Sequence, residues 1–234
     1  FLKAGSDLWM SSPKLVDLFI DKHPGIKANR PWPNAPHPDV LLERWETLQS
    51  ATGDTRAQLF KVTSDRDLFR EVKPLPGYPK QKPLGEDSGE CPSLVRIGWR
   101  SFDIQYLIPD NRVLDRPGPI LWEVVSDEQV FVIELHSEPL RAGPGLVFSH
   151  LIPANSYLKG RGGRTFPLWR DAEATTPNLT PGFLDTWSET LGVAVTPTDW
   201  LEYLAGITGY PGFQEHFASD LVAPGIRVPL TTDT

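Results

Sequence analysis

The sequence predicts an α+β fold, with a central and mainly antiparallel sheet, helices at both ends and a helical set at the C-terminus. Three observations predict it. Residues 94–169 contain short segments rich in β-branched and aromatic residues, which favour strands. The apolar residues change from an alternating to a helical spacing near Asn178. The 24 prolines and 19 glycines indicate many loops between short elements.

Residues 1–93 are expected to form an N-terminal part of helices and loops. Its first segment is interrupted by proline too often for long regular structure. "HPDVLLERWETLQSATG" then places its apolar residues on one helical stripe, with Pro38 in the first turn. We expect short helices to continue through residues 54–72, and the proline-rich residues 73–92 to form a long loop that is a boundary or a functional excursion.

Residues 94–177 are expected to form a β-rich recognition core. The predicted strands lie in "LVRIGWRSFDIQYLI", "QVFVIEL", "GLVFSHLI" and "RTFPLW". Residues 178–234 are expected to form a C-terminal helical part of three short helices. The first has Thr180 as its N-cap and Pro181 at its first position, and it ends at Gly192. We expect the three parts to form one compact domain.

Composition excludes several classes of protein. No apolar run approaches the roughly 18 residues that span a bilayer, so we expect no membrane partner and a cytoplasmic location. A lone Cys91 excludes an internal disulfide and a cysteine-based zinc site. The net charge of −7 argues against a general polyanion binder. The charge is uneven, however: residues 1–117 carry 17 basic and 16 acidic residues, and the remainder carries 6 and 14.

Motifs for self-contained catalysis are missing. The sequence has no phosphate-binding G-x-x-x-x-G-K-[ST], no dinucleotide-binding G-x-G-x-x-G in a strand–turn–helix context, no H-E-x-x-H and no G-x-S-x-G. The "NPPY" type of tetrapeptide of amino-methyltransferases is also missing. We therefore expect no catalytic residue, no metal and no cofactor in this chain. It opens on Phe1, and we interpret it as part of a longer polypeptide.

One segment suggests an alternative, a small metal-dependent hydrolase. In "VIELHSE", alternation places Glu134, His136 and Glu138 on one face of a predicted strand, where they could hold a metal. The simpler interpretation is a polar, solvent-facing edge opposite Val132, Ile133 and Leu135, and it is favoured because such alternation arises easily.

The segment "GWRSFDIQYLIPDNRVLDRP" carries candidate DNA-binding residues. Arginine and amide side chains are those that contact guanine and adenine edges with two hydrogen bonds. The candidates are Arg100, Gln105, Arg112 and Arg116. An alternative for Arg100 is an ion pair with Asp103 that orders the strand. Arg112 and Arg116 lie on a predicted turn, where we expect them to be exposed.

A second group of cations lies in "SYLKGRGGRTFPLWRD". Lys159, Arg161 and Arg164 supply charged donors, and the glycines among them allow the backbone to approach a phosphate closely. Phe166 and Trp169 would anchor this loop in the core. The alternative is a surface loop whose charges pair with neighbouring acids.

These segments, together with the C-terminus, resemble the C-terminal specificity region of type ISP restriction–modification enzymes. The resemblance covers most of the chain, and its motifs are "KANRPWPNAP", "LVRIGWRSFDIQYLIPDNRVLDRPGPILW", "QVFVIELHSEPL", "KGRGGRTFPLW", "PNLTPGFLD" and "YPGFQEHFASDLVAPGIRVPLTTD". The Arg-x-Phe-Asp element of that family matches Arg100, Phe102 and Asp103. Many relatives have Arg where Gln105 stands, so this position departs from the family pattern.

The resemblance implies a division of labour. This region would recognise a specific sequence in double-stranded DNA and present it to an upstream adenine-specific methyltransferase. Translocase and nuclease domains of the same polypeptide would also lie upstream, and S-adenosylmethionine, ATP and Mg²⁺ would belong to those domains.

Overall fold

Helices lie at the two ends of the described chain and most strands between them, as the sequence predicted. The computed structural model describes residues 6–140, 143–158 and 163–232. The helices of these residues are α1 (Asp7–Ser11), α2 (Leu15–Leu18), α3 (Pro38–Ser50), α4 (Gly53–Phe60), α5 (Pro119–Glu123), α6 (Phe183–Leu191), α7 (Pro197–Gly209) and α8 (Pro211–His216), with the 3-10 turns η1 (Leu84–Glu86) and η2 (Asn111–Val113). The strands are β1 (His23–Pro24), β2 (Asn34–Ala35), β3 (Val95–Arg100), β4 (Asp103–Leu107), β5 (Phe131–Leu135), β6 (Leu146–Ser149) and β7 (Gly163–Pro167).

These strands form two antiparallel sheets instead of the one central sheet that the sequence suggested. One sheet has the order β1-β7-β5-β6 and the other the order β2-β4-β3. The sheets stay separate because an irregular segment, residues 152–155, covers the free edge of β3. In that segment the Ile152 carbonyl accepts from the Gly98 N–H (3.1 Å), and the Ala154 N–H donates to the Gly98 carbonyl (2.8 Å).

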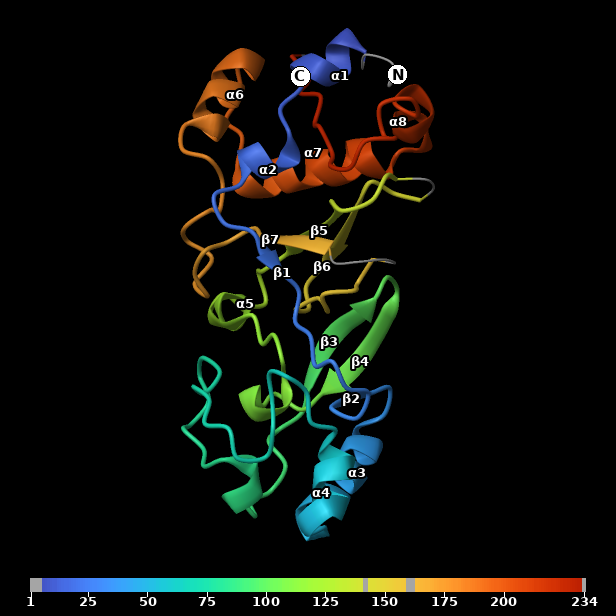
Figure 1. The fold of residues 1–234 in the computed structure, drawn as a ribbon. Coiled ribbons are helices and arrows are strands. Elements are labelled where there is room, and N and C mark those ends of the chain that lie inside the picture. Colours follow the sequence, from blue (N-terminus) through green and yellow to red (C-terminus); the bar gives the residue numbers. More distant parts are fainter. Residues whose placement is uncertain (1–5, 141–142, 159–162, 233–234) are drawn as a thin grey trace.

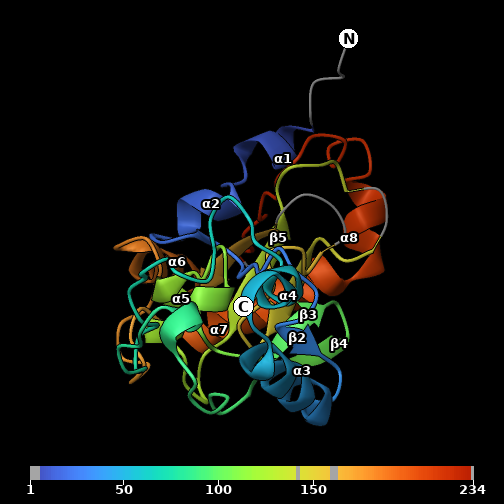
Figure 2. The same ribbon diagram turned by 60° about the horizontal axis from the view of Figure 1, so that its bottom comes forward.

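Figure 1 shows an elongated molecule with the four-stranded sheet near its middle. Helices α1, α2 and α6–α8 lie at one end and α3 and α4 at the other. Viewed from the α3–α4 end, β3 and β4 lie on one side of the molecule and α5 and α6 on the other (Figure 2). The C-terminal segment packs against the N-terminal helices, where the Leu15 N–H donates to the Ile226 carbonyl (2.8 Å) and the Ser6 N–H donates to Asp220 Oδ1 (2.9 Å).

Strand β5 lies between two hydrophobic cores. Phe131 and Ile133 belong to the first core, which lies beneath the β3–β4 hairpin and helices α3 and α4. Val132 belongs to the second core, which lies beneath the terminal helices. All three residues are fully buried. A strand that is covered on both faces needs an almost continuous apolar run, and this explains the composition of "VFVIEL".

Two glycines lie where other parts of the chain approach closely. A Cβ on Gly25 would lie 2.5 Å from the Pro153 carbonyl oxygen and from the Ala154 carbonyl carbon. A Cβ on Gly98 would lie 2.5 Å from Cε2 of Tyr157. At Gly25 the close atoms are backbone, so only glycine permits this approach, whereas at Gly98 the Tyr157 side chain would have to move.

Some helix ends follow the local signals in the sequence, and the predicted start of α6 does not. Pro38 occupies the first turn of α3 as predicted, and a reciprocal capping box between Thr196 and Asp199 starts α7. Helix α6, however, starts at Phe183 after Gly182, whose φ is 77°, and not after Thr180. The Thr180 hydroxyl instead donates to the Asp17 carbonyl (2.8 Å). Thr180 therefore binds a residue distant in sequence and does not cap the helix.

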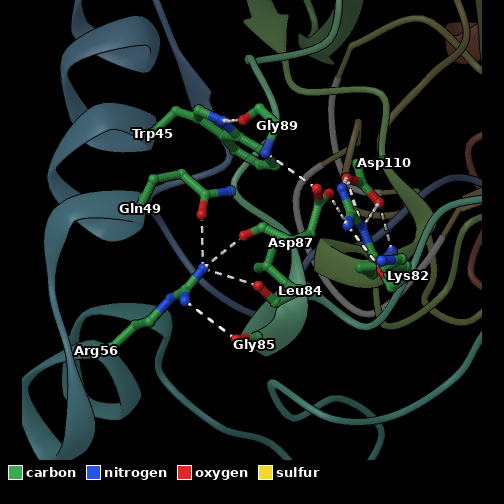
Figure 3. A network of polar contacts seen from close by, with 10 residues as sticks. Trp45, Gln49, Arg56, Lys82, Leu84, Gly85, Asp87, Gly89 and Asp110 are labelled. Carbon is green, nitrogen blue, oxygen red and sulfur yellow. Dashed lines mark hydrogen bonds and ion pairs between the residues drawn. The ribbon is translucent and has the colours of Figure 1, made fainter.

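The proline-rich loop of residues 73–92 is held by side chains from α3 and α4. Arg56 donates to the carbonyls of Leu84 (2.8 Å) and Asp87 (3.1 Å), and the Trp45 indole N–H donates to the Gly89 carbonyl (3.1 Å) (Figure 3). Leu84 is buried in the first core. The loop is therefore an integral part of that core.

Candidate nucleic-acid interface

The β3–β4 hairpin ends in a two-residue turn of Ser101 and Phe102. Phe102 has a φ of 64°, and its surface is 100% exposed. Single exposed apolar residues are common on protein surfaces, but an aromatic residue at positive φ is not, because glycine or asparagine occupies such a turn position at lower cost. The turn thus presents an aromatic ring to solvent at a conformational cost.

Contacts with one neighbouring segment, residues 156–157, fix the direction of this turn. The Ser101 N–H donates to the Tyr157 carbonyl (3.2 Å). The Arg100 guanidinium donates to the Ser156 hydroxyl (2.8 Å) and to the Trp99 carbonyl (2.8 Å), and it lies 4.5 Å from the centroid of the Trp99 ring. Arg100 and Asp103 face each other in the strand register. Arg100 is half-buried, with its Nη1 engaged by Ser156 and Trp99.

Gln105 lies on the central strand of the small sheet, half-buried between two polar neighbours. Its Oε1 accepts from Asn34 Nδ2 (2.6 Å), and its Nε2 donates to Asp103 Oδ2 (3.3 Å). A glutamine amide has two hydrogens on Nε2 and two lone pairs on Oε1. One of each remains for a ligand, in an orientation that the other two bonds fix.

A groove of about 430 Å³ lies between this hairpin and β6. The hairpin contributes Arg96, Phe102 and Ile104, and the opposite side includes Phe148 and Tyr157. Arg96 is exposed. The groove therefore combines aromatic and aliphatic surface with a cation at its rim.

Arg112 is buried, and the expectation that it would be exposed is wrong. Its guanidinium donates to both oxygens of Asp110 (2.6–3.0 Å), to the Lys82 carbonyl (2.9 Å) and to Asp87. Burial alone would lower the pKa of Arg112, but the bonds and charges of Asp110 and Asp87 outweigh it and raise that pKa. Because every guanidinium nitrogen has a partner in the protein, Arg112 holds the loop of residues 73–92 and is not available to DNA.

Arg116 is exposed, as expected, and it is paired with a second cation. Its backbone forms an antiparallel bridge with Lys27, with N–O distances of 2.8 and 2.9 Å. Lys27 is exposed as well. Two neighbouring cations of this kind suit an anionic backbone better than a base edge.

The basic stretch is only partly visible, because Lys159 and Arg161 lie outside the described residues. Arg164 is on β7, and its Nη1 lies 3.4 Å from Glu134 Oε2. The Arg164 side chain is 25% exposed and that of Glu134 is 1% exposed. For Arg164 the structure therefore shows the pairing with an acid that the sequence offered as the alternative to a phosphate.

The three side chains of the hydrolase alternative have unlike surroundings. Glu134 is buried, and its Oε1 accepts from the Ile226 N–H (2.7 Å). His136 lies beyond the end of β5, and Glu138 is exposed. Within the described residues, no three His, Cys, Asp or Glu side chains come close enough together to hold a metal ion. The structure thus gives Glu134 a role in joining β5 to the C-terminal segment, and the hydrolase alternative is not favoured.

Glu134→Gln is expected to change how stability depends on pH. Burial raises the pKa of Glu134 above its ordinary value of 4.5, although the Ile226 N–H and Arg164 act against this. Between pH 4.5 and the folded pKa, the folded state holds one more proton than the unfolded state, so the free energy of unfolding falls as pH rises. Gln keeps an acceptor for Ile226 and does not titrate. The free energy of unfolding of the variant, relative to that of the wild type, should therefore rise by up to about 1.4 kcal/mol per pH unit in this window.

Urea unfolding of both proteins from pH 4 to pH 7 measures this difference. Other carboxylates contribute equally to the two curves, so their difference isolates Glu134. Parallel curves across the window would show that Glu134 titrates alike in the folded and unfolded states.

Three exposed residues were not among the sequence-based candidates for DNA binding. Arg96 alternates with the buried Ile97 along β3, and this period-two signal could have identified it. Lys27 carries no such signal, because its neighbour Arg116 is 89 positions away in the sequence. Phe102 was noted only as part of the family motif, and its exposure follows from the turn that the chain makes there.

Comparison with known proteins now identifies the family. Residues 17–234 match the model of the Type ISP C-terminal specificity domain. No curated protein has a matching sequence. Within the described residues, no helix is both long enough and apolar enough to cross a membrane.

Three solved structures contain a similar fold. They are a cryo-electron microscopy structure of a DrdV–DNA complex (16% identity, TM-score 0.61), a nuclease-deletion mutant of the Type ISP restriction-modification enzyme LlaGI in complex with a DNA substrate mimic (14%, 0.57), and the ATP-dependent Type ISP restriction-modification enzyme LlaBIII bound to DNA (12%, 0.64). The matches cover 99%, 97% and 98% of this chain but 23%, 18% and 16% of those chains, in the same order. Because the family model matches nearly the whole of this chain, the chain belongs to the Type ISP C-terminal specificity domain family.

Proposed function

We propose that this chain recognises a specific sequence in double-stranded DNA as the specificity domain of a restriction–modification enzyme. The observation that carries the proposal is the family match over residues 17–234. Two further observations support it. The similar solved structures contain DNA, and the β3–β4 hairpin presents a guanidinium, an amide and an aromatic ring near one exposed turn.

Within this proposal, Arg100 and Gln105 contact base edges, because each is held in a fixed direction by neighbouring polar groups. Arg96, Lys27 and Arg116 are exposed cations and contact phosphates. Lys159 and Arg161 are assigned to phosphates as well, on their sequence alone. Arg164 adds little to phosphate binding, because Glu134 compensates part of its charge.

We also propose that the chemistry lies elsewhere in the natural polypeptide. On this view the chain itself is non-catalytic and binds no cofactor, and it acts in the cytoplasm. It presents the target to an adenine methyltransferase that precedes it, and S-adenosylmethionine, ATP and Mg²⁺ serve the methyltransferase, translocase and nuclease domains. Because phosphate contacts dominate non-specific affinity, a domain with a net charge of −7 should bind DNA weakly alone.

The test is a DNA titration of the complete natural polypeptide at several salt concentrations. Its target is first identified by selecting bound duplexes from a random-sequence pool. Arg96→Ala and Arg116→Ala should each weaken binding to target and scrambled duplexes alike, and each should reduce the salt slope by about 0.9. Arg100→Ala should instead cost about 1–3 kcal/mol and relax the preference at one base pair.

Arg170→Ala is the matched control, since Arg170 is an exposed arginine whose charge Asp21 already compensates at 2.8 Å. It removes the same charge, and we expect it to leave both affinity and slope unchanged. If the selection yields no preferred sequence, or if Arg100→Ala weakens all duplexes equally, this chain does not recognise bases through the hairpin.

A further inference from the structure

The ring of Phe102 is the most exposed large apolar side chain among the described residues, at 100% against 68% for Phe69. Nothing in the described fold uses it, because it contributes to neither hydrophobic core. The positive φ of Phe102 adds a conformational cost that glycine would avoid. Strained positions of this kind gather at functional sites, where the surrounding structure holds them in place.

The backbone that carries the ring is also held in place. Both residues that flank the turn, Arg100 and Asp103, are paired in the strand register, and the Ser101 N–H is bound by the Tyr157 carbonyl. The Arg100 guanidinium binds Ser156 on the same neighbouring segment. A side chain with two rotatable bonds on a fixed turn loses little entropy when it binds, so this arrangement favours insertion into a partner.

Charge around the turn selects an anionic partner. Arg96 is exposed on β3, and Arg100 stands directly before the turn. The nearby Asp103 keeps its negative charge, because its bond to Gln105 is to a neutral amide (3.3 Å), so the two guanidinium groups and this carboxylate leave a net charge of +1 (two positive, one negative). An apolar ring flanked by guanidinium groups suits a ligand that has an apolar interior and an anionic exterior, and a DNA duplex is such a ligand.

We propose that Phe102 inserts its ring between two neighbouring base pairs of the target duplex and partly unstacks them. This inference rests on the proposed function, and it names a residue and a mode of recognition within it. Unstacking is easiest at pyrimidine–purine steps such as TA and CA/TG. The wedge therefore contributes specificity without any hydrogen bond to a base, and the target should contain a pyrimidine–purine step at the point of insertion.

The experiment places the fluorescent base 2-aminopurine at successive positions of the selected target and adds the complete natural polypeptide. The wild type should raise the fluorescence at one step, where the ring separates the bases. Phe102→Ala should abolish that rise and weaken binding about 5- to 150-fold, the range measured for losing one aromatic stack. Phe102→Trp should restore both. Phe69→Ala removes another exposed phenylalanine and should change neither.

The possible outcomes separate the two proposals. If the wild type shows no sequence preference, the proposed function fails. If it binds its target and every fluorescence rise persists in Phe102→Ala, the unstacking arises elsewhere in the enzyme and the wedge is overturned. If replacing one thymine by uracil weakens the wild type but not Phe102→Ala, and no step unstacks, the ring touches a thymine methyl in the groove and the wedge is again wrong. Equal urea unfolding of wild type and Phe102→Ala checks that the variant is folded.

Discussion

Arg30→Ala is expected to lower the free energy of unfolding by about 3–5 kcal/mol, because it leaves a buried carboxylate without its counter-charge. Arg30 Nη2 lies 3.0 Å from Asp115 Oδ1, and both side chains are 0% exposed. Its Nη1 donates to the Val113 carbonyl (2.7 Å), and the guanidinium lies 4.7 Å from the centroid of the Phe60 ring. Without the arginine, the buried Asp115 carboxylate keeps only the neutral amide of Asn29 and the more distant charge of Arg66.

Urea unfolding at pH 7 measures this loss. Arg170→Ala is the control, because its bridge to Asp21 is 43% and 39% exposed, and such bridges contribute about 0–1 kcal/mol. Removing both charges with Arg30→Met and Asp115→Leu should recover most of the stability, since the cost comes from the unpaired charge. Equal losses for Arg30→Ala and Arg170→Ala would show that burial of the pair does not matter.

Gly25→Ala is expected to destabilise the protein by about 1–3 kcal/mol. The new Cβ would lie within 2.6 Å of three backbone atoms of Pro153 and Ala154, and backbone cannot rotate away as a side chain can. The segment that separates the two sheets must therefore shift, and with it the hydrogen bond from the Ile26 N–H to the Pro153 carbonyl (3.0 Å).

Gly206→Ala provides a control of opposite sign. Gly206 lies within α7, and a Cβ there meets nothing within 4 Å. Alanine in a helix interior should therefore stabilise the protein by about 0.5–1 kcal/mol. Thermal or urea unfolding compares the two variants. A gain in stability for Gly25→Ala would mean that the segment of residues 152–155 yields without cost.

Features of the fold with local causes were predictable from the sequence. Pro38 begins α3 as expected, and the terminal helices follow Asn178. Features that depend on distant partners were not. Strands β1 and β2 have two residues each and no pattern of their own, and they exist because β7 and β4 offer free edges. The separation into two sheets follows from residues 152–155, which carry no sequence signal for that position.

The candidate site divides along the same line. The chemistry of arginine and amide side chains identified the neighbourhood of Arg100, and the turn that follows Arg100 is exposed at Phe102. The same reasoning failed for Arg112, because sequence shows that an arginine is near a turn but not that Asp87, 25 positions earlier, folds over it. For Arg164 the partner is Glu134, 30 positions earlier on a neighbouring strand. The roles of Arg100, Gln105, Arg116, Lys159 and Arg161 toward DNA stay predictions.

The sharing of β5 between two cores limits how this domain can diversify. Its alternate residues serve opposite sides, with Val132 in one core and Ile133 in the other. The cores also draw on distant parts of the chain, so a crossover near residue 93 or 177 between two homologous genes would mix mismatched halves of a core. New specificities should therefore arise by exchange of the whole domain, or by point substitution at places that neither core uses. The Ser101–Phe102 turn is such a place, because substitutions there leave both cores unchanged.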